Sequence, residues 1–133
     1  MEFVPKTIQQ TIRFNVTPNR LYETYIDSKK HSTSINSKAS ISRKVGEKFS
    51  AYDGYIKGKN LFIVPNRLVI QSWRGLDWRK KDLDSTLILT FSKTRSGCRL
   101  DMVHVNVPDH MYRHIKKGWH EHYWQPWKRY FRS

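Results

Sequence analysis

Cysteine, acidic residues and long apolar runs are all scarce in this sequence. Its only cysteine, Cys98, cannot form an internal disulfide, which indicates a reducing, cytoplasmic environment. No stretch reaches the roughly 18 apolar residues that a membrane-spanning helix needs. The first ten residues, MEFVPKTIQQ, also lack the basic and apolar regions of a secretory signal. These absences argue against a disulfide-rich secreted scaffold and against a membrane span, and they favour a soluble protein.

Aromatic residues, by contrast, are abundant. The 133 residues include five Trp, seven Tyr and six Phe, and each such ring buries roughly 150–250 Å² in a folded protein. A chain of this length falls within the usual size of one domain. We therefore expect a single globular domain over residues 1–133, with a substantial hydrophobic core.

The charge is strongly one-sided, because 25 Lys and Arg stand against 11 Asp and Glu, for a net charge of +14. The basic residues are spread along the whole chain, and the only dense cluster is Arg79-Lys80-Lys81. Such a distribution favours an acidic protein partner and weak, salt-sensitive contacts with polyanions. No stripe of alternating basic and aromatic residues accompanies the charge, which argues against nucleic acid as the partner.

The first forty residues predict one strand and a short helix pair. Apolar residues at even spacing indicate a half-buried strand over residues 6–14. Thr17 and Pro18 then fit the N-cap and the first position of an amphipathic helix. The polar residues 27–38 fit a second short helix followed by a loop.

From Ala39 onward the sequence alternates between apolar and polar residues, which predicts an antiparallel meander. Turn signals at Asp53-Gly54 and Pro65-Asn66 separate the strands. We interpret Gly58, like Gly54, as a turn glycine with a positive φ and not as part of a phosphate-binding loop. The expected strands comprise residues 39–44, 48–52, 55–64, 67–74, 82–92 and 98–107.

Alternation along these strands also assigns side chains to faces. In the strand that contains Trp73, the neighbouring Arg74 must point to the opposite face. We expect Arg74 to pair internally, with Asp53 or Asp101 as its partner, unless it contacts another molecule. The apolar side chains expected on one face of the next strand are Leu83, Leu87, Leu89 and Phe91.

Residues 110–131 predict one long and unusually aromatic helix, because large apolar residues recur every three or four positions. We expect Asp109 to cap its N-terminus and Pro126 to kink it or to start a new turn. An antiparallel sheet must cover one of its faces, and this helix is the only element long enough. The predicted fold is therefore α+β, with a curved antiparallel sheet that grips one long C-terminal helix and a short helix pair after the first strand.

Such a fold commonly leaves a cavity between sheet and helix, and cavities of this kind are preferred ligand sites. The aromatic side chains of the helix suit a flat apolar ligand, and they also suit a packed core. His104 fits either a hydrogen-bonded core histidine or a polar anchor inside the cavity. The residues expected to line the cavity are Tyr22, Trp73, Leu89, Met102, His104, Trp119 and Tyr123.

Motifs for catalysis or metal binding are missing from the sequence. His110 and His114 have the i, i+4 spacing of a metal chelate, but no third ligand lies near them in the sequence. Cys98 begins a strand without a neighbouring histidine, as expected of a buried or edge thiol. No serine elbow or paired-carboxylate signature occurs. We therefore predict a non-enzymatic binding protein without a metal or cofactor.

A set of spaced residues forms a recognisable pattern over most of the chain. It comprises Val45-Gly46, Phe49, Asp53-Gly54, Gly58, Leu61, Val64-Pro65, Ile70, Trp73-Arg74, Trp78, Val107-Pro108, Gly118-Trp119, Tyr123 and Lys128. The pattern resembles the C-terminal domain family of the activator of heat shock protein 90 ATPase. This resemblance implies the START-like, birch-pollen-allergen-like helix-grip fold of the SRPBCC superfamily. Where family members often continue with acidic residues after the second tryptophan, this chain has Arg79, Lys80 and Lys81.

Two hypotheses for the function result from these observations. The first is the binding of an apolar small molecule in a cavity between the sheet and the C-terminal helix. The alternative, implied by the resemblance, is a co-chaperone-like contact with a heat shock protein 90 chaperone or with another acidic protein partner.

Overall fold

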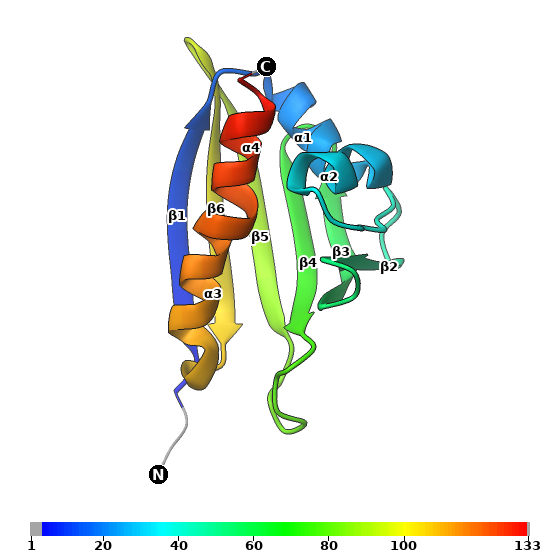
Figure 1. Cartoon of the computed structure of the whole chain (residues 1–133), viewed down its shortest axis with the longest axis vertical. Helices are drawn as coiled ribbons and strands as arrows, with labels where there is room; N and C mark the ends of the chain where they lie inside the picture. Colours follow the sequence, from blue (N-terminus) through cyan, green and yellow to red (C-terminus); the bar gives the residue numbers. More distant parts are fainter. Residues whose placement is uncertain (1–3, 133) are drawn as a thin grey trace.

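The fold is built around one six-stranded antiparallel sheet. The computed structural model describes residues 4–132, and its strand order is β1-β6-β5-β4-β3-β2 (Figure 1). Every neighbouring pair of strands is antiparallel, so the predicted meander is confirmed. The strands are β1 (Lys6–Phe14), β2 (Lys48–Ala51), β3 (Ile56–Val64), β4 (Leu68–Gly75), β5 (Ser85–Thr94) and β6 (Gly97–Val107).

Two short helices follow β1 and lie at the end of the sheet where the chain ends (Figure 1). Helix α1 (Pro18–Ile26) begins as predicted, because the Thr17 hydroxyl accepts a hydrogen bond from the Arg20 amide at 3.2 Å. Helix α2 (Ser28–Ile35) is capped in the same way by the carboxylate of Asp27. Local capping therefore fixes both helix starts.

The strand predicted over residues 39–44 is wrong, since only one isolated bridge joins this segment to β2. Side chains of α2 form hydrogen bonds with the backbone amides of this segment instead. The Ser32 hydroxyl accepts from the Ala39 amide at 2.9 Å, and the Ser28 hydroxyl accepts from the Ile41 amide at 2.8 Å. The segment is therefore held against a helix and does not extend the sheet.

The predicted long C-terminal helix is confirmed, but its geometry changes along its length. A 3₁₀ turn, η1 (Asp109–Met111), leads into α3 (Tyr112–Trp119), a π-helical turn, η2 (His120–Trp124), and α4 (Gln125–Tyr130). Asp109 does not cap the helix as predicted, because its carboxylate pairs with Lys6 at 3.5 Å. No helix in residues 4–132 is both long enough and apolar enough to cross a membrane.

Pro126 lies in the first turn of α4, directly after the π turn. It has no N–H to donate to the carbonyl of His122, four residues earlier. That carbonyl accepts a hydrogen bond from the Tyr52 hydroxyl instead. The proline thus leaves an acceptor on the helix, and the turn between β2 and β3 is attached to the helix at this point.

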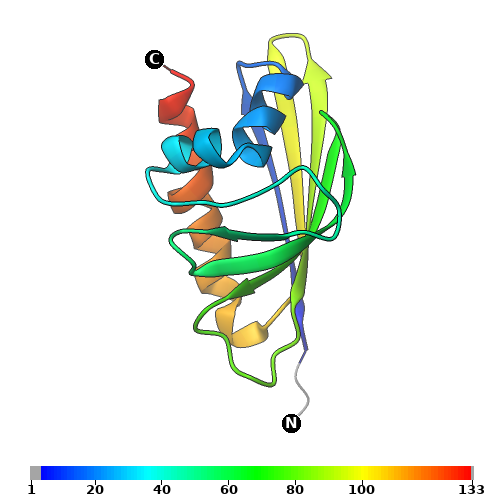
Figure 2. The same cartoon turned by 90° about the vertical axis from the view of Figure 1, so that its right-hand side faces the viewer.

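The C-terminal helix runs along one face of the curved sheet, with α1 and α2 beside its C-terminal half (Figure 2). Buried and partly exposed residues alternate along β4, β5 and β6. The buried residues of these strands form one hydrophobic core with the apolar side of the helix. The predicted helix-grip fold is therefore confirmed.

Gly54 and Gly58 serve different purposes. Gly54 has a φ of +91°, as predicted for a turn glycine, whereas Gly58 lies inside β3 and has no positive φ, so its interpretation as a turn residue is wrong. A Cβ at position 58 would lie 1.8 Å from the Ser72 carbonyl oxygen and 2.6 Å from the ring of Phe49. Glycine is needed there because a neighbouring strand and a core ring both approach the backbone closely.

Two side-chain predictions near the β4–β5 connection are also wrong. Leu83 precedes β5 and is 75% exposed, so it lies outside the buried face of that strand. Arg74 does pair internally, as expected, but within the described residues its partner is neither Asp53 nor Asp101. Its guanidinium lies 3.3 Å from the carboxylate of Asp84, because the loop after β4 folds back over it.

Candidate functional site

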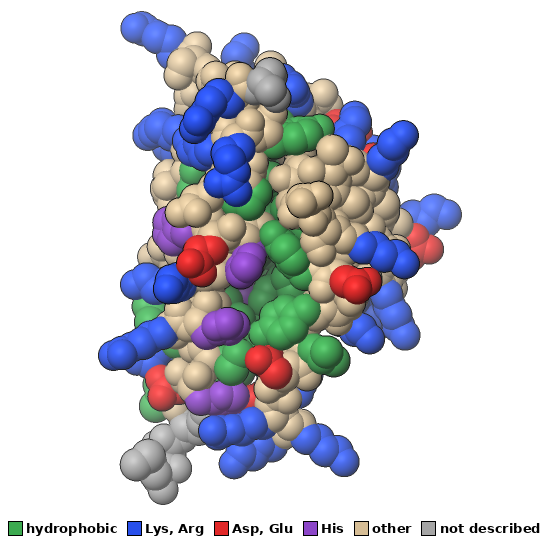
Figure 3. Space-filling model, in the orientation of Figure 1, with side chains coloured by type: hydrophobic (Ala, Val, Ile, Leu, Met, Phe, Trp, Pro, Cys, Tyr) green, Lys and Arg blue, Asp and Glu red, His purple; other side chains and the backbone are tan. Residues whose placement is uncertain are grey.

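An apolar cleft opens between the C-terminal helix and strands β3 and β4. Its volume is about 330 Å³, and most of its wall is aromatic or aliphatic. Figure 3 shows green apolar side chains in a strip beside the C-terminal helix, bordered by purple histidines. We call this feature the aromatic cleft, and its residues are Tyr52, Tyr55, Ile56, Trp73, His114, Ile115, Gly118, Trp119, His122 and Tyr123.

The largest rings of the aromatic cleft come from β4 and from two successive turns of the helix. The ring centroid of Trp119 lies 6.0 Å from that of Trp73 and 5.1 Å from that of Tyr123. Such aromatic pairs contribute about 0.5–1.5 kcal/mol each beyond the area they bury. Among the described residues, a Cβ at Gly118 would meet only the ring edge of His122, at 3.6 Å. The glycine therefore leaves the cleft open down to the helix backbone.

The structure divides the seven residues that we predicted to line a cavity into two groups. Three of them line the aromatic cleft, namely Trp73, Trp119 and Tyr123. The other four are buried in the core with at most 2% exposure, namely Tyr22, Leu89, Met102 and His104. The C-terminal half of the helix fills the interior, because Trp127 is fully buried between the rings of Phe14 and Tyr25. The opening is therefore confined to α3 and η2 and does not extend along the whole helix.

His104 connects the core to the wall of the aromatic cleft. Its Nδ1 accepts a hydrogen bond from Trp119 Nε1 at 3.1 Å, and its Nε2 lies 2.8 Å from the Ser85 hydroxyl. Since that hydroxyl donates its proton to the Trp73 carbonyl, Nε2 must carry the imidazole proton. Burial lowers the pKa of His104 to about 3. The neutral ring therefore acts as a hydrogen-bonded core histidine that orients Trp119.

A second buried histidine, which the sequence pattern did not indicate, holds Tyr123. His31 Nδ1 lies 2.8 Å from the Tyr25 carbonyl oxygen, so Nδ1 carries the proton, and the Tyr123 hydroxyl donates to Nε2 at 2.8 Å. Burial lowers the pKa of His31 to about 4 and raises that of the Tyr123 hydroxyl well above its ordinary value. Two neutral imidazoles of opposite tautomer therefore fix two neighbouring rings of the cleft.

Replacing Tyr123 with phenylalanine should keep the ring in the cleft and leave His31 Nε2 without a donor. A buried polar group that loses its partner costs about 1–3 kcal/mol. We expect the free energy of unfolding, measured with urea, to fall by this amount without a change in the m value. The control Tyr112→Phe removes a hydroxyl from a partly exposed ring and should cost less than about 0.5 kcal/mol. Equal stability of the two variants would contradict the assigned hydrogen bond.

Some cleft residues could be found from the sequence and others could not. Tyr52 and Tyr55 flank the turn between β2 and β3, and only the tertiary fold brings this turn to the helix. His114, Gly118 and His122, by contrast, are spaced by four, which places them on one face of the helix. This spacing was the signal that the cleft continues past Trp119.

The histidines of the chain do not assemble into a metal site. His110 Nε2 lies 2.8 Å from a carboxylate oxygen of Asp82, and residues 4–132 contain no group of three potential metal ligands. Cys98 is buried, and burial raises the pKa of its thiol, which disfavours the reactive thiolate. The aromatic cleft offers apolar surface with a few hydroxyl and imidazole groups, a composition suited to reversible binding of an apolar group.

A curved antiparallel sheet that grips one long helix, with an aromatic cleft between them, defines a START-like helix-grip protein. The model of the family "Activator of Hsp90 ATPase homolog 1-like protein" matches residues 15–132. The chain therefore belongs to this family, and the resemblance seen in the sequence is confirmed.

Curated relatives carry the same description. The chain is 26% identical over 115 residues to the activator of 90 kDa heat shock protein ATPase homolog of Dictyostelium discoideum, covering 86% of this chain and 30% of that protein. It is 24% identical over 125 residues to the human homolog 1, covering 94% of this chain and 36% of that protein. The chain thus spans about a third of the length of these relatives.

Solved structures show the same fold. An HSP90 activator from Plasmodium falciparum matches with a TM-score of 0.83 and 24% identity, covering 90% of this chain and 91% of that one. The Aha1 protein from Colwellia psychrerythraea, described as a dimer, matches with a TM-score of 0.75 and 15% identity, covering 90% of this chain and 92% of that one. At these identities the likeness establishes the architecture.

Proposed function

We propose that this chain is a non-enzymatic, co-chaperone-like protein that binds a 90-kDa heat shock protein and stimulates its ATPase. The observation that carries the proposal is family membership over residues 15–132, supported by relatives named as activators of that ATPase. On this proposal the protein performs no chemistry of its own, uses no cofactor and works in the cytoplasm.

The surface charge supports an acidic partner. Several carboxylates of the chain are already engaged by its own guanidinium groups. Glu23 lies 2.7 Å from Arg43, and Asp101 lies 3.0 Å from Arg99. The net charge of +14 is therefore carried by basic side chains in excess of these pairs, and it favours encounter with a negatively charged protein.

Stimulation of ATP hydrolysis tests this function. The full chain, added to a purified 90-kDa heat shock protein, should raise the ATPase rate at least about twofold, which corresponds to a barrier lowered by roughly 0.4 kcal/mol. Because charge assists the encounter, the effect should weaken between about 50 and about 200 mM salt. Lysozyme, a basic protein of unrelated fold, is the control for nonspecific charge effects. No rate change and no binding at low salt would refute the proposal.

A second candidate function is the binding of an apolar small molecule in the aromatic cleft. The observation that favours it is the cleft volume of about 330 Å³, which falls at the lower end of the range for ligand pockets, about 300–1,000 Å³. Flat apolar molecules suit walls formed by Trp73, Trp119 and Tyr123. Such binding is compatible with the chaperone contact, because the cleft occupies only one face of the molecule.

Filling the cleft from the helix side tests this second function. Gly118→Leu should place a side chain in the cleft, because within residues 4–132 the side chain near a Cβ at this position is that of His122, at 3.6 Å. Native mass spectrometry of the wild type should show a retained small molecule, which the Gly118→Leu variant lacks. Gly118→Ala is the matched control and should retain it. A wild type that carries no extra mass and binds no hydrophobic fluorescent probe would argue against a ligand.

A further inference from the structure

The loop between β4 and β5, residues 76–84, is fixed by its own polar contacts. The Arg74 guanidinium donates to the carbonyl oxygens of Arg79 at 2.6 Å and of Asp82 at 2.7 Å. The Asp82 carboxylate in turn accepts from the Arg79 amide at 2.7 Å and lies 2.8 Å from His110 Nε2. These bonds tie the loop to β4 and to η1. Its outer side chains are therefore presented from a defined backbone.

Trp78 anchors the same loop in the core. It is only 6% exposed, its ring centroid lies 5.7 Å from that of Trp73, and the Arg74 guanidinium lies 5.9 Å from its ring. The Tyr55 hydroxyl donates to the Asp77 carboxylate at 2.7 Å. Since Trp73 and Tyr55 also line the aromatic cleft, the loop and the cleft share two residues as a common support.

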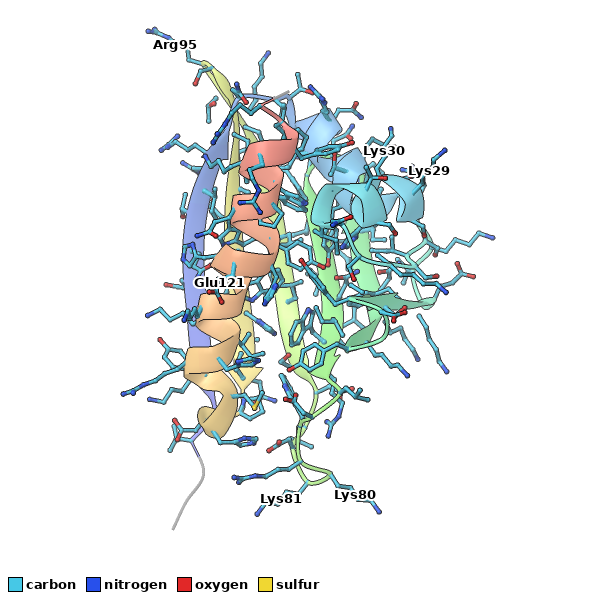
Figure 4. The ribbon with its side chains drawn as sticks, viewed as in Figure 1. Lys29, Lys30, Lys80, Lys81, Arg95 and Glu121 are labelled. Carbon is cyan, nitrogen blue, oxygen red and sulfur yellow. The ribbon has the colours of Figure 1, made fainter. Side chains whose placement is uncertain are left out.

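The outer side of the loop carries two leucines and three cations. Leu76 is 72% exposed and Leu83 is 75% exposed. Arg79, Lys80 and Lys81 occupy the apex, and Figure 4 shows Lys80 and Lys81 extending away from the body of the protein. The loop also contains three aspartates, whose carboxylates lie against Tyr55, His110 and Arg74. Within residues 4–132 none of the three apex cations forms a side-chain ion pair, although the Arg79 charge still attracts the Asp82 carboxylate. The loop therefore combines unpaired positive charge with exposed apolar surface, a combination that marks interaction sites.

We infer that residues 76–84, which we call the leucine–lysine loop, dock an acidic protein segment that carries an apolar side chain. Carboxylates of the partner meet the cations at the apex, and its apolar side chain packs against Leu76 and Leu83. That this partner is a 90-kDa heat shock protein rests on the proposed function above. The surface itself is defined by the loop alone.

The order of residues along the loop favours a protein over an anionic membrane. Leu76 directly follows β4 and Leu83 lies two residues before β5, so both leucines sit at the base of the loop, behind the cations. A segment that enters a bilayer needs the opposite order, with its apolar groups deepest and its cations at the headgroup level. A protein segment can contact the apex and the base together.

Two charge-matched triple variants test the docking surface. The loop variant combines R79E, K80E and K81E. The control combines K29E, K30E and R95E, which are exposed on α2 and at the β5–β6 turn, at the other end of the molecule (Figure 4). Both changes lower the net charge equally. We expect the loop variant to weaken binding to a 90-kDa heat shock protein at least about tenfold, or about 1.4 kcal/mol, and the control to weaken it less than about threefold.

A neutral variant and a second probe complete the test. Leu76→Ser combined with Leu83→Ser keeps the charge and should weaken binding at least about fivefold without changing its salt dependence. A fluorescent peptide of alternating Glu and Leu, used as an acidic probe, should bind the wild type and the control but not the loop variant. Circular dichroism of each variant verifies folding, which exposed positions should not disturb.

The possible outcomes test the docking role of the loop and the proposed function separately. Chaperone binding that is equally weak in both triple variants, or unchanged in the loop variant, overturns the loop as a docking surface while the proposed function stands. Loop-dependent binding of the peptide without any binding of the chaperone overturns the proposed function alone. If neither the chaperone nor the peptide binds the wild type, both the docking loop and the proposed function are overturned. If the wild type bound phosphatidylserine vesicles through the loop and did not bind the peptide, the partner would be an anionic membrane and not a protein.

Discussion

Lowering the pH from 7 to 5 should remove about 4 kcal/mol from the free energy of unfolding, and His31 and His104 should account for most of it. Both imidazoles are buried and neutral, and burial lowers their pKa values from 6.5 to about 4 and about 3. Between pH 6.5 and pH 4 the unfolded chain therefore binds protons that the folded chain does not, so stability falls as the pH falls. At pH 5 each histidine contributes roughly 2 kcal/mol to this loss.

The hydrogen bonds explain why neither imidazole can accept its second proton without damage. Protonation of His104 at Nδ1 would turn the acceptor of the Trp119 indole into a donor, and protonation of His31 at Nε2 would do the same to the acceptor of Tyr123. Each event places an unpaired charge in the core and disconnects one ring of the aromatic cleft. Acid should therefore loosen the cleft before the rest of the sheet.

Urea titrations at half-unit intervals between pH 7 and pH 5 measure this dependence. Removing one titrating group, as in His104→Gln or His31→Gln, should reduce the slope of unfolding free energy against pH by up to about 1.4 kcal/mol per pH unit. The matched control is His120→Gln, which replaces an exposed histidine of the C-terminal helix. A slope that survives both core substitutions would contradict the assignment.

The sequence predicted the elements whose signals are local. β1 matches its predicted bounds, and α1 begins at the predicted cap, because alternation and an N-cap depend only on neighbouring residues. The segment 39–44 alternates equally well and is not a strand. Serine hydroxyls of the preceding helix α2 accept hydrogen bonds from its amides, and alternation within the segment does not contain that information.

In the candidate site, too, local signals could be predicted and tertiary contacts could not. The periodicity of the last helix identified Trp119 and Tyr123, and alternation along β4 identified Trp73. How far the opening extends could not be predicted, because that depends on whether rings from distant parts of the chain, here Phe14 and Tyr25, enclose the C-terminal part of the helix at Trp127. Trp127 is fully buried there, so the opening ends at η2. The hydrogen bond between the Tyr52 hydroxyl and the helix carbonyl left free by the proline is likewise a tertiary contact. The turn at Asp53-Gly54 was predicted, but its place beside the helix was not.

Gly58→Ala should destabilise the protein by about 3 kcal/mol or more, although the change adds a single methyl group in a strand. The added Cβ would lie 1.8 Å from the Ser72 carbonyl oxygen, which belongs to the backbone of β4 and cannot rotate away. It would also lie 2.6 Å from the ring of Phe49, which is buried. The β3–β4 pair must therefore separate, at a cost in ladder hydrogen bonds and core packing that exceeds ordinary overpacking.

Gly118→Ala is the matched control for this substitution, because it adds the same methyl group at a helical glycine. There the new Cβ would meet the ring edge of His122 at an ordinary 3.6 Å, and alanine is favoured over glycine in a helix by roughly 0.5–1 kcal/mol. The two variants should thus shift the thermal midpoint in opposite directions. A loss below about 1 kcal/mol for Gly58→Ala would mean that β3 and β4 are not held as close at Ser72 as the structure indicates. It would remove the physical reason for glycine at that position.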